Sequence, residues 1–439
     1  MSDEHARSIR SINFQSHRAK KNYIEAVSDW LVKTDISRFY PSIYTHSIPW
    51  AAYGKDKVKS NIPLYEGSLA DRIDVLLRAC NRNQTVGIPI GPESSRIIAE
   101  IISARIDNDF AEKAPYIENN AIDRLQDDWF IGLKTLESAE RALSTIGSVY
   151  RNYSLDINGS KTSVTRVIGE FGQQWVSEIG AFLSHKPGPV RGSRLREFLY
   201  LSIRMQIKFP SEAVTSYVLS IIETQSISPA DVEPLESFLL KSALISPSAM
   251  NVIGRLLINI QHTTKRLSCS RIADRFTSLA ISNLSNERTY EAIWQIYTLR
   301  GLKTKLKASK FAEMQEGAPS SVVGLLLLDM ESKGLVVGRL PKVEWSKLIT
   351  EEKSLADASW LLGYEGIRHG WLSDTNRLSR TPFFDAMLSR NIVFYDDKRN
   401  VLPSSGVVRR KLSQRAENIR ETQLMLLAMR GFDFGKHSG

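Results

Sequence analysis

Several common protein classes depend on residues of which this sequence has little. Its 439 residues include only two cysteines, Cys80 and Cys269, and seven scattered histidines, which offer neither a disulfide framework nor the spacing of a zinc site. No apolar run approaches the roughly 20 residues that span a bilayer. The beginning of the sequence contains acidic residues and no apolar core, so it does not resemble a secretory signal. We therefore expect a cytoplasmic protein with no membrane association and no metal cluster built from His or Cys.

Charge is unevenly distributed along the chain. The net charge is +10 at pH 7, yet residues 1–164 hold 21 basic and 21 acidic residues. The whole excess therefore lies in residues 165–439, and such an asymmetry is typical of a region that holds a polyanion. Many basic proteins bind no nucleic acid, so the charge by itself does not decide the partner.

The pattern of predicted helices and strands changes near residue 166 and indicates two domains. These are an α/β domain over residues 1–165 and an all-α domain over residues 166–439. The first mixes helices with short β-like runs, including a strand around Leu31–Ile36 and an amphipathic helix from about Ser95. The second consists of helical segments separated by short Pro, Ser or Asn breaks. Because no strict repeat is present, it is either a HEAT-like solenoid of paired helices or an irregular bundle.

The stretch RLQDDWFIG, residues 124–132, places Asp127 and Asp128 side by side between two apolar runs. Adjacent carboxylates repel each other and resist desolvation, so they need either water or a counter-charge. The flanking runs predict two short strands and a hairpin with the carboxylates at its tip. Taken alone, the pair is either an exposed turn, in which Asp is common, or a metal site.

The surrounding motifs follow an order that favours the metal site. Asp35 ends a predicted strand in TDISRFYPSIY, and the turn GIPIGPESS at Gly87–Ser95 leads into a helix. The double-Asp hairpin comes next, and Lys161 follows in the extended segment LDINGSKTSV. This order resembles the palm of reverse transcriptases, over about residues 31–165. The resemblance implies a reverse-transcriptase-like palm.

A nucleotidyl-transfer site is implied by that resemblance. Asp35 and Asp127, assisted by Asp128, would bind two Mg²⁺ or Mn²⁺ ions, whose charge would offset the repulsion between the carboxylates. Lys161 matches the family's lysine near the pyrophosphate, a general acid or electrostatic stabiliser. Tyr40 matches the aromatic gate against the ribose 2′-hydroxyl, and glycines let the backbone approach the nucleotide. The complete set of implied nucleotide-binding residues is Arg38, Phe39, Tyr40, Gly87 and Gly91.

Three departures from ordinary reverse transcriptases narrow the resemblance. Leu and Gln precede the two aspartates where Tyr is usual before x-Asp-Asp, and Ile90 stands where Gln is usual. Few residues precede the Asp35 strand, so the fingers are reduced, although RAKKNY at 18–23 offers some phosphate contacts. These departures argue against templated copying. The combination is most similar to the abortive-infection branch of bacterial reverse transcriptases, the Abi polymerases, in which a large helical domain follows the palm.

That branch implies a specific activity. Abi polymerases defend bacteria against phage, form oligomers, and make DNA without a template from a protein hydroxyl, so the product stays attached to a tyrosine. The implied partners are therefore dNTPs, covalently attached single-stranded DNA and further copies of the chain, in the bacterial cytoplasm. Tyr23, Tyr44 and Tyr116 are the candidates for priming, although most of the 14 tyrosines must be structural.

Two other functions stay open at this stage. One is a template-dependent RNA-directed DNA polymerase of the retron or intron type, against which the residue at Ile90 argues. The other is a non-catalytic helical scaffold that binds nucleic acid or partner proteins through residues 166–439. The presence of Asp35, Asp127, Asp128 and Lys161 argues against an inactive palm.

Overall fold

Two compact units make up the chain, Met1–Gly172 and Gln173–Gly439. The structure is a computed structural model that describes residues 14–169, 174–185, 188–210, 212–225, 227–311, 320–348, 359–374 and 377–399. Within these ranges no helix is both long and apolar enough to cross a membrane. The sequence pattern had suggested a division slightly earlier, between residues 165 and 166.

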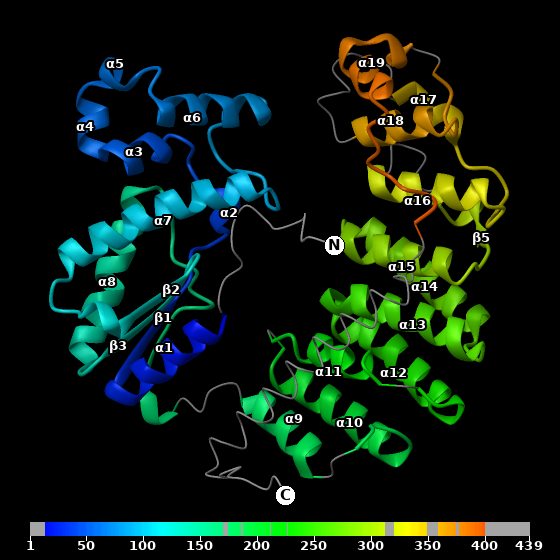
Figure 1. Ribbon diagram of the computed structural model, residues 1–439, viewed down its shortest axis with the longest axis horizontal. Coiled ribbons are helices and arrows are strands. Elements are labelled where there is room, and N and C mark those ends of the chain that lie inside the picture. Colours follow the sequence, from blue (N-terminus) through cyan, green and yellow to red (C-terminus); the bar gives the residue numbers. More distant parts are fainter. Residues whose placement is uncertain are drawn as a thin grey trace, which may run out of the picture. The chain divides into compact units, whose positions relative to one another are not determined.

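A four-stranded antiparallel sheet forms the centre of the first unit (Figure 1). Its order is β2-β3-β1-β4, so the first strand of the chain lies inside the sheet and pairs with both β3 and β4. The strands are short and contain the β-branched and aromatic residues that suit a pleated, buried surface. Their bounds are β1 Trp30–Thr34, β2 Ile122–Leu125, β3 Asp128–Leu133 and β4 Ser163–Arg166.

Helices surround this sheet within residues 14–169. Among them α3 contacts α4, α6 and α7, so that α3–α6 form a helical group on α7. A capping box begins α8, in which the side chains of Thr135 and Ser138 each accept a backbone N–H. The bounds are α1 Phe14–Val27, α2 Phe39–Ser42, α3 Ser47–Tyr53, α4 Lys55–Ser60, α5 Ile62–Tyr65, α6 Leu69–Cys80, α7 Glu93–Lys113 and α8 Leu136–Asn152.

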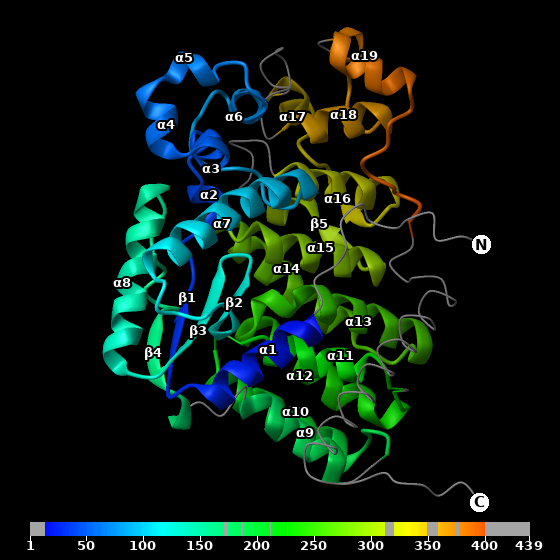
Figure 2. The same cartoon turned by 60° about the vertical axis from the view of Figure 1, so that its left-hand side comes forward.

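Successive side chains along a strand point to opposite faces of the sheet, and each face packs into its own apolar core. Leu31 and Phe130 join Ile24 of α1 in a small cluster on one face. Their neighbours Val32 and Ile131 belong to the larger core that includes α7 and α8. Figure 2 accordingly shows α1 and α8 on opposite sides of the strands. The two central strands, β1 and β3, are therefore largely buried.

The second unit is helical over most of its described residues, with one short parallel strand pair. Neighbouring helices contact one another, as α12 does α13 and α14 does α15, around one continuous apolar core. The bounds are α9 Gln174–His185, α10 Ser193–Lys208, α11 Val214–Ile222, α12 Val232–Ile245, α13 Met250–Thr264, α14 Cys269–Ser285, α15 Thr289–Gly301, β5 Leu306–Lys307, α16 Ser321–Ser332, β6 Val336–Val337, α17 Lys342–Leu348, α18 Trp360–Arg368 and α19 Pro382–Ser389.

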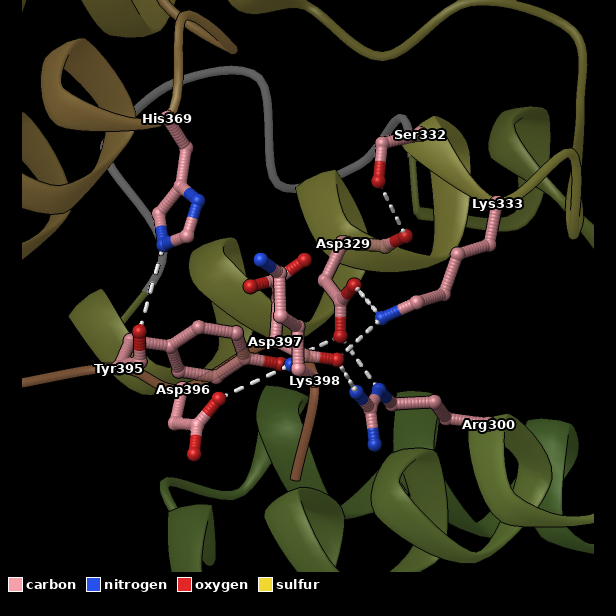
Figure 3. Close-up of polar contacts among 9 residues, drawn as sticks. All are labelled: Arg300, Asp329, Ser332, Lys333, His369, Tyr395, Asp396, Asp397 and Lys398. Atoms are coloured by element: carbon pink, nitrogen blue, oxygen red, sulfur yellow. Dashed lines mark hydrogen bonds and ion pairs between the residues drawn. The ribbon is translucent and has the colours of Figure 1, made fainter. Parts of the chain in front are cut away.

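A buried charged cluster joins a late segment of the chain to this helical unit (Figure 3). Asp329 on α16 is fully buried, and its carboxylate accepts from Arg300 on α15, from Lys333, and from the Tyr395 hydroxyl at 2.7 Å. Arg300 and Lys333 each also donate to the carbonyl oxygen of Asp397 at 2.8 Å. Each buried charge in the cluster thus has partners, which is the condition for a stable buried ion pair.

Candidate active site

The antiparallel register of β1 and β3 brings the predicted aspartates to one end of the sheet. Thr34 pairs with Trp129, the last pair of that ladder. Asp35 follows β1 directly, and Asp128 begins β3, so the next position in the register sets these two residues opposite each other. Segments far apart in the sequence therefore meet at this end, as the motif order requires.

The β2–β3 hairpin has the predicted form, with a two-residue loop of Gln126 and Asp127 between the paired residues Leu125 and Asp128. Gln126 has φ +59°, a left-handed conformation in which glycine is usual at the first loop position. A longer side chain in this conformation costs free energy, which the surroundings have to offset. Such local strain is typical of functional sites.

Arg124 supplies the contacts that hold the hairpin tip. Its guanidinium donates to Asp107 and to Glu100 on α7, each at 2.7 Å, and to the carbonyl oxygen of Gln126 at 2.8 Å. The planar fork of arginine fixes direction as well as distance to carboxylates. The tip that carries Asp127 is therefore anchored to α7.

Asp35 is only 4% exposed. Its Oδ2 accepts from Nζ of Lys161 at 2.7 Å and from the amide Nδ2 of Asn158 at 3.3 Å. Its Oδ1 is buried and has no hydrogen-bond donor. A buried carboxylate oxygen without a donor destabilises the fold, and a catalytic role or a bound ion is the usual explanation.

Asn158 organises the loop that carries Lys161. Its backbone N–H donates to the carbonyl oxygen of Asp35 at 2.8 Å, and its own carbonyl accepts from the Lys161 N–H at 3.1 Å. The Ser160 hydroxyl donates to its Oδ1 at 2.7 Å, which leaves the amide nitrogen for Asp35. Sequence reasoning treated this asparagine only as part of an Asn-Gly turn and missed it. Its place three residues before the lysine was the available signal.

The carboxyls of Asp35 and Asp127 titrate differently because their surroundings differ. Burial opposes ionisation of Asp35, but hydrogen bonds with Lys161, Asp127 and Asn158 hold its pKa below the usual value. Burial, the hydrogen bond to Asp35, and the charges of Asp35 and Asp128 raise the pKa of Asp127 to about 7. The bond to Asp35 raises the pKa of Lys161. Without a cation, the two adjoining carboxyls therefore resist being charged together, and a bound cation would offset that repulsion.

These carboxylates fit a divalent cation as a pair and not as a closed cage. Among the residues that the structure describes, no group of three or more His, Cys, Asp or Glu side chains is arranged to hold a metal ion. Mg²⁺ usually takes one or two protein carboxylates and completes its shell with water and substrate phosphates. The donor-free Oδ1 of Asp35 and the adjoining carboxyl of Asp127 fit that requirement, so these two residues would hold the ion. Asp128 is exposed, and its assisting role stays a prediction.

The residues after Asp35 differ in how they face the site. Phe39 is 4% exposed and packs edge-to-face on Tyr40, with ring centroids 5.6 Å apart, so its ring supports Tyr40. Tyr40 is half-buried, and burial together with the charge of Asp127 raises the pKa of its phenol. Arg38, with φ +49°, is exposed. Of the three, Tyr40 is thus the side chain whose electrostatic environment includes the carboxylates.

The glycine-rich turn pairs with the segment that follows Asp35. The Gly87 N–H donates to the carbonyl oxygen of Ile43 at 2.8 Å. Gly87 has φ +91°, and a Cβ there would lie 3.1 Å from the carbonyl oxygen of Pro41, so the protein's own backbone requires glycine at this position. Gly91, with φ +117°, has open space around it, and Ile90 is 73% exposed. Close approach to a nucleotide stays a prediction for both glycines.

The three candidate priming tyrosines lie in different surroundings. Tyr44, in the segment that follows Asp35, is half-buried and forms a bridge with Val86, the residue before the glycine-rich turn. Tyr23 lies on α1 and is half-exposed. The ring of Tyr116 lies 4.5 Å from the guanidinium of Arg141, near the start of α8 and therefore toward the sheet end remote from the hairpin tip. Which of them primes stays a prediction.

Comparison with known proteins agrees with this geometry. Residues 4–205 match the family described as reverse transcriptase (RNA-dependent DNA polymerase). The match contains every candidate residue above and extends past the first unit into α9 and α10. No curated protein matches the chain. The matched segment, with its paired aspartates and strand order, shows that this chain carries a reverse transcriptase domain over residues 4–205.

Proposed function

We propose that this protein is a DNA polymerase of the abortive-infection branch of reverse transcriptases. It extends DNA without a template from a tyrosine hydroxyl of the protein itself, and it acts in bacterial defence against phage. The observation that carries the proposal is the meeting of Asp35, Asp127 and Lys161 at one end of the sheet, within a reverse transcriptase domain.

The side chains divide the work of nucleotidyl transfer. Asp35 and Asp127 would hold the divalent ions, which would supply charge neutralisation for the attacking and leaving oxygens. Lys161 keeps a proton at Nζ next to Asp35, and because its side chain is 64% exposed it can turn toward a leaving pyrophosphate. Asn158 orients Asp35 and the lysine loop together. Arg124 keeps Asp127 at the tip while substrate exchanges.

Substrate choice in the proposal depends on two side chains. Tyr40, supported from behind by Phe39, is the gate that excludes the ribose 2′-hydroxyl, so the substrates are dNTPs. Ile90 is exposed and cannot hydrogen-bond where related enzymes use glutamine near nucleotide and template, which supports template independence.

In this proposal, residues 165–439 bind the growing single strand of DNA. The net positive charge of residues 165–439 suits a single strand with one phosphate per nucleotide. Contacts between neighbouring helices support a HEAT-like stack, in which each helix covers the apolar face of the next. The reduced fingers, in this proposal, are the helical group α3–α6.

The test is incorporation of radiolabelled dNTP into the purified protein with neither template nor primer added. We expect label that migrates with the protein under denaturing conditions and is released by protease. Asp127→Asn should abolish labelling, while Glu140→Gln, an exposed carboxylate on α8, should label like wild type. Equal labelling of Asp127→Asn would refute the metal assignment. Labelling only with an added RNA template would instead identify a template-dependent enzyme, and DNA binding without incorporation would identify a scaffold.

The priming residue has its own measurement. Mass spectrometry of protease-digested, dNTP-treated protein should find a nucleotide-modified tyrosine peptide. Single Tyr→Phe changes at Tyr23, Tyr44 and Tyr116 should remove label at one position only, and Tyr44 is the first to test because of its place beside the glycine-rich turn. Full labelling in all three variants would remove these candidates.

A further inference from the structure

Helix α1 contacts β2 and β3 on the face of the sheet opposite α8 (Figure 2). His17, Lys21 and Ile24 recur at positions i, i+4 and i+7, so they follow the side of α1 that faces the strands. Nδ1 of His17 lies 3.0 Å from Oδ1 of the buried Asp123 on β2. Ile24 packs in the small apolar cluster with Phe130. Lys21 therefore occupies a sheet-facing position, where packing alone favours an apolar residue.

The close approach of α1 to β3 fixes the position of this lysine. A Cβ at Gly132 on β3 would collide with Oγ of Ser28 and with Cγ2 of Ile24, so glycine is required where the end of the helix meets the strand. The histidine contact holds the helix before Lys21, and the glycine contact holds it after Lys21. The ammonium group of this lysine is thus carried by a helix that is anchored at both ends.

A second lysine meets Lys21 at the ring of Phe130. Lys33 of β1 is the cross-strand partner of Phe130 in the β1–β3 ladder, so the two side chains share the face on which α1 packs. Nζ of Lys21 lies 5.4 Å and Nζ of Lys33 5.7 Å from the centre of that ring. Both lysines are half-buried. One ring therefore gathers two positive charges, and an anion placed there is attracted by both.

The strand register sets Lys33 next to the carboxylates. Lys33 precedes Asp35 by two residues, and its partner Phe130 follows Asp128 by two residues. Residues two apart along a strand lie on the same face, about 6.6–6.8 Å from each other. The sugar and phosphate of one nucleotide span a step of this size. The two lysines therefore lie one nucleotide from the reacting position.

Lys21 is itself close enough to act on the site electrostatically. Partial desolvation and the charge of Asp35 raise the pKa of Asp128, whereas the charges of Lys161 and Lys21 lower it. The carboxylates thus lie between two cationic groups that come from different elements. Lys161 stands before β4, and Lys21 lies over Phe130 of β3.

The direction of the reaction decides which phosphate reaches the lysine pair. In nucleotidyl transfer the attacking and leaving oxygens lie roughly in line, on opposite sides of the transferred phosphorus. Lys161, which is assigned above to the leaving pyrophosphate, lies on the β4 side of Asp35. In the sheet order β3-β1-β4, Lys21 lies on the other side. The attacking end of the DNA therefore arrives from the side of the lysine pair.

We propose that Lys21 and Lys33 bind the backbone of the growing DNA at the first phosphodiester behind its reacting end. The inference rests on the proposed polymerase activity and adds a binding site for the product. Ammonium groups give a phosphate charge-assisted hydrogen bonds without reading the base. The site therefore accepts any sequence, as synthesis without a template requires, and the ring of Phe130 supports both cations.

The first experiment separates the first nucleotide from those that follow. When the first nucleotide joins the protein, no phosphodiester stands behind the attacking hydroxyl. Lys21→Gln/Lys33→Gln should therefore incorporate a labelled dideoxynucleotide, which stops after one addition, like wild type. With ordinary dNTPs its elongation should slow about tenfold, as expected when a charge-assisted contact is lost. The length of protein-attached DNA at equal times, on denaturing gels, measures elongation.

Two further variants control this measurement. Lys21→Arg/Lys33→Arg keeps both charges and should elongate close to the wild-type rate. Lys20→Gln/Lys113→Gln removes two exposed lysines, one beside Lys21 on α1 and one at the end of α7, and should elongate like wild type. Equal slowing in this control would reduce the effect to net charge and overturn the proposal. Circular dichroism and thermal midpoints establish that each variant is folded.

The second experiment measures binding without chemistry. Fluorescence anisotropy gives the dissociation constant of a labelled single-stranded oligodeoxynucleotide over a range of salt concentrations, in EDTA and without dNTP. The slope of log affinity against log salt should become shallower by about 0.7–1.4 in Lys21→Gln/Lys33→Gln, because one or two phosphate contacts are lost. The slope of Lys20→Gln/Lys113→Gln should equal that of wild type.

The outcomes distinguish this site from the polymerase proposal. Elongation of Lys21→Gln/Lys33→Gln at the wild-type rate, or an unchanged salt slope, would overturn the phosphodiester site and leave the polymerase standing. Equal loss of the first addition and of elongation would also overturn it, because the lysines would then bind the triphosphate of the incoming dNTP. A wild type that incorporates nothing but shows the lysine-dependent slope would refute the polymerase and leave the DNA-binding site standing.

Discussion

Two of the buried aspartates, Asp35 in the first unit and Asp329 in the second, have opposite surroundings. Asp329 in the helical unit is fully buried, and Arg300, Lys333 and the Tyr395 hydroxyl all donate to it. Asp35 in the sheet unit is nearly as buried, yet one of its oxygens has no donor, and the carboxyl of Asp127 lies against it. Burial alone does not separate a structural carboxylate from a catalytic one. These two aspartates differ in how many of their acceptor positions are satisfied.

The cationic side chains beside these two aspartates differ in their exposure to solvent. The side chain of Arg300 is 8% exposed and is held by two partners, whereas that of Lys161 is 64% exposed. A cation in water can leave its carboxylate with little loss, because exposed ion pairs contribute only about 0–1 kcal/mol. Lys161 can therefore leave Asp35 and contact substrate, whereas Arg300 stays bound to Asp329.

The largest effect is expected for Asp35→Asn, on activity. Loss of a metal-holding carboxylate should reduce dNTP incorporation by about 10³-fold or more, equivalent to about 4 kcal/mol. The thermal midpoint should change little, because Lys161 is solvated once its partner is neutral. Rates per folded molecule and calorimetry measure the two effects. Activity above a tenth of wild type would show that Asp35 is not a ligand.

The reverse pattern is expected for Asp329→Ala. Removing this carboxylate leaves the buried Arg300 without its counter-charge, which should lower the free energy of unfolding by about 3–5 kcal/mol. Urea unfolding of the full chain measures the change. Glu331→Ala, which alters a partly exposed acid on the same helix, should cost less than about 1 kcal/mol. An equally small loss of unfolding free energy in Asp329→Ala would show that Asp329 is not a structural carboxylate.

A smaller effect on activity is expected for Asn158→Ala. The Asp35 carboxylate loses one donor, so its pKa should rise, and the acidic limb of the rate profile should move to higher pH. We expect a rate about tenfold lower at neutral pH, equivalent to about 1.4 kcal/mol. Ser160→Ala, which removes only the donor to the Asn158 side chain, should shift the limb less. An unshifted profile would mean that Asn158 only shapes the loop.

The smallest effect is a gain of stability in Asp127→Asn without divalent cations. The folded pKa of Asp127, about 7, exceeds its unfolded value, so the folded state binds a proton more strongly. Wild type therefore loses stability as pH rises from about 4 to about 7. Because the pKa of Asp35 is lowered, its titration affects stability only below that pH range. In EDTA at pH 8, Asp127→Asn should melt about 2–4 °C higher than wild type. Equal midpoints at pH 8 would show that the carboxyls do not repel each other.

Local patterns in the sequence predicted most of the elements that surround the site. The apolar, β-branched run at 30–34 forms β1, and the double-Asp stretch forms the hairpin, because both depend on neighbouring residues. The long helix after the glycine-rich turn is α7. The motif order also indicated a reverse transcriptase, and the family match bears this out at the level of the domain. The narrower Abi assignment, the priming tyrosine and template independence stay predictions.

The sequence did not predict the features that depend on packing between distant segments. Nothing local to Asn158 shows that its amide meets Asp35, and nothing local to Arg124 shows that it holds the hairpin to α7.

On its own, the sequence determined which residue types occur in which order, and therefore the chemistry available: paired carboxylates, a lysine and a glycine-rich turn. The tertiary structure decided that Asp35 lies opposite the hairpin, that one of its oxygens has no donor, and that Asp329 has a full set. The reason is physical. Strand register and burial arise from contacts between segments distant in the chain, and these contacts set the solvation of each charge.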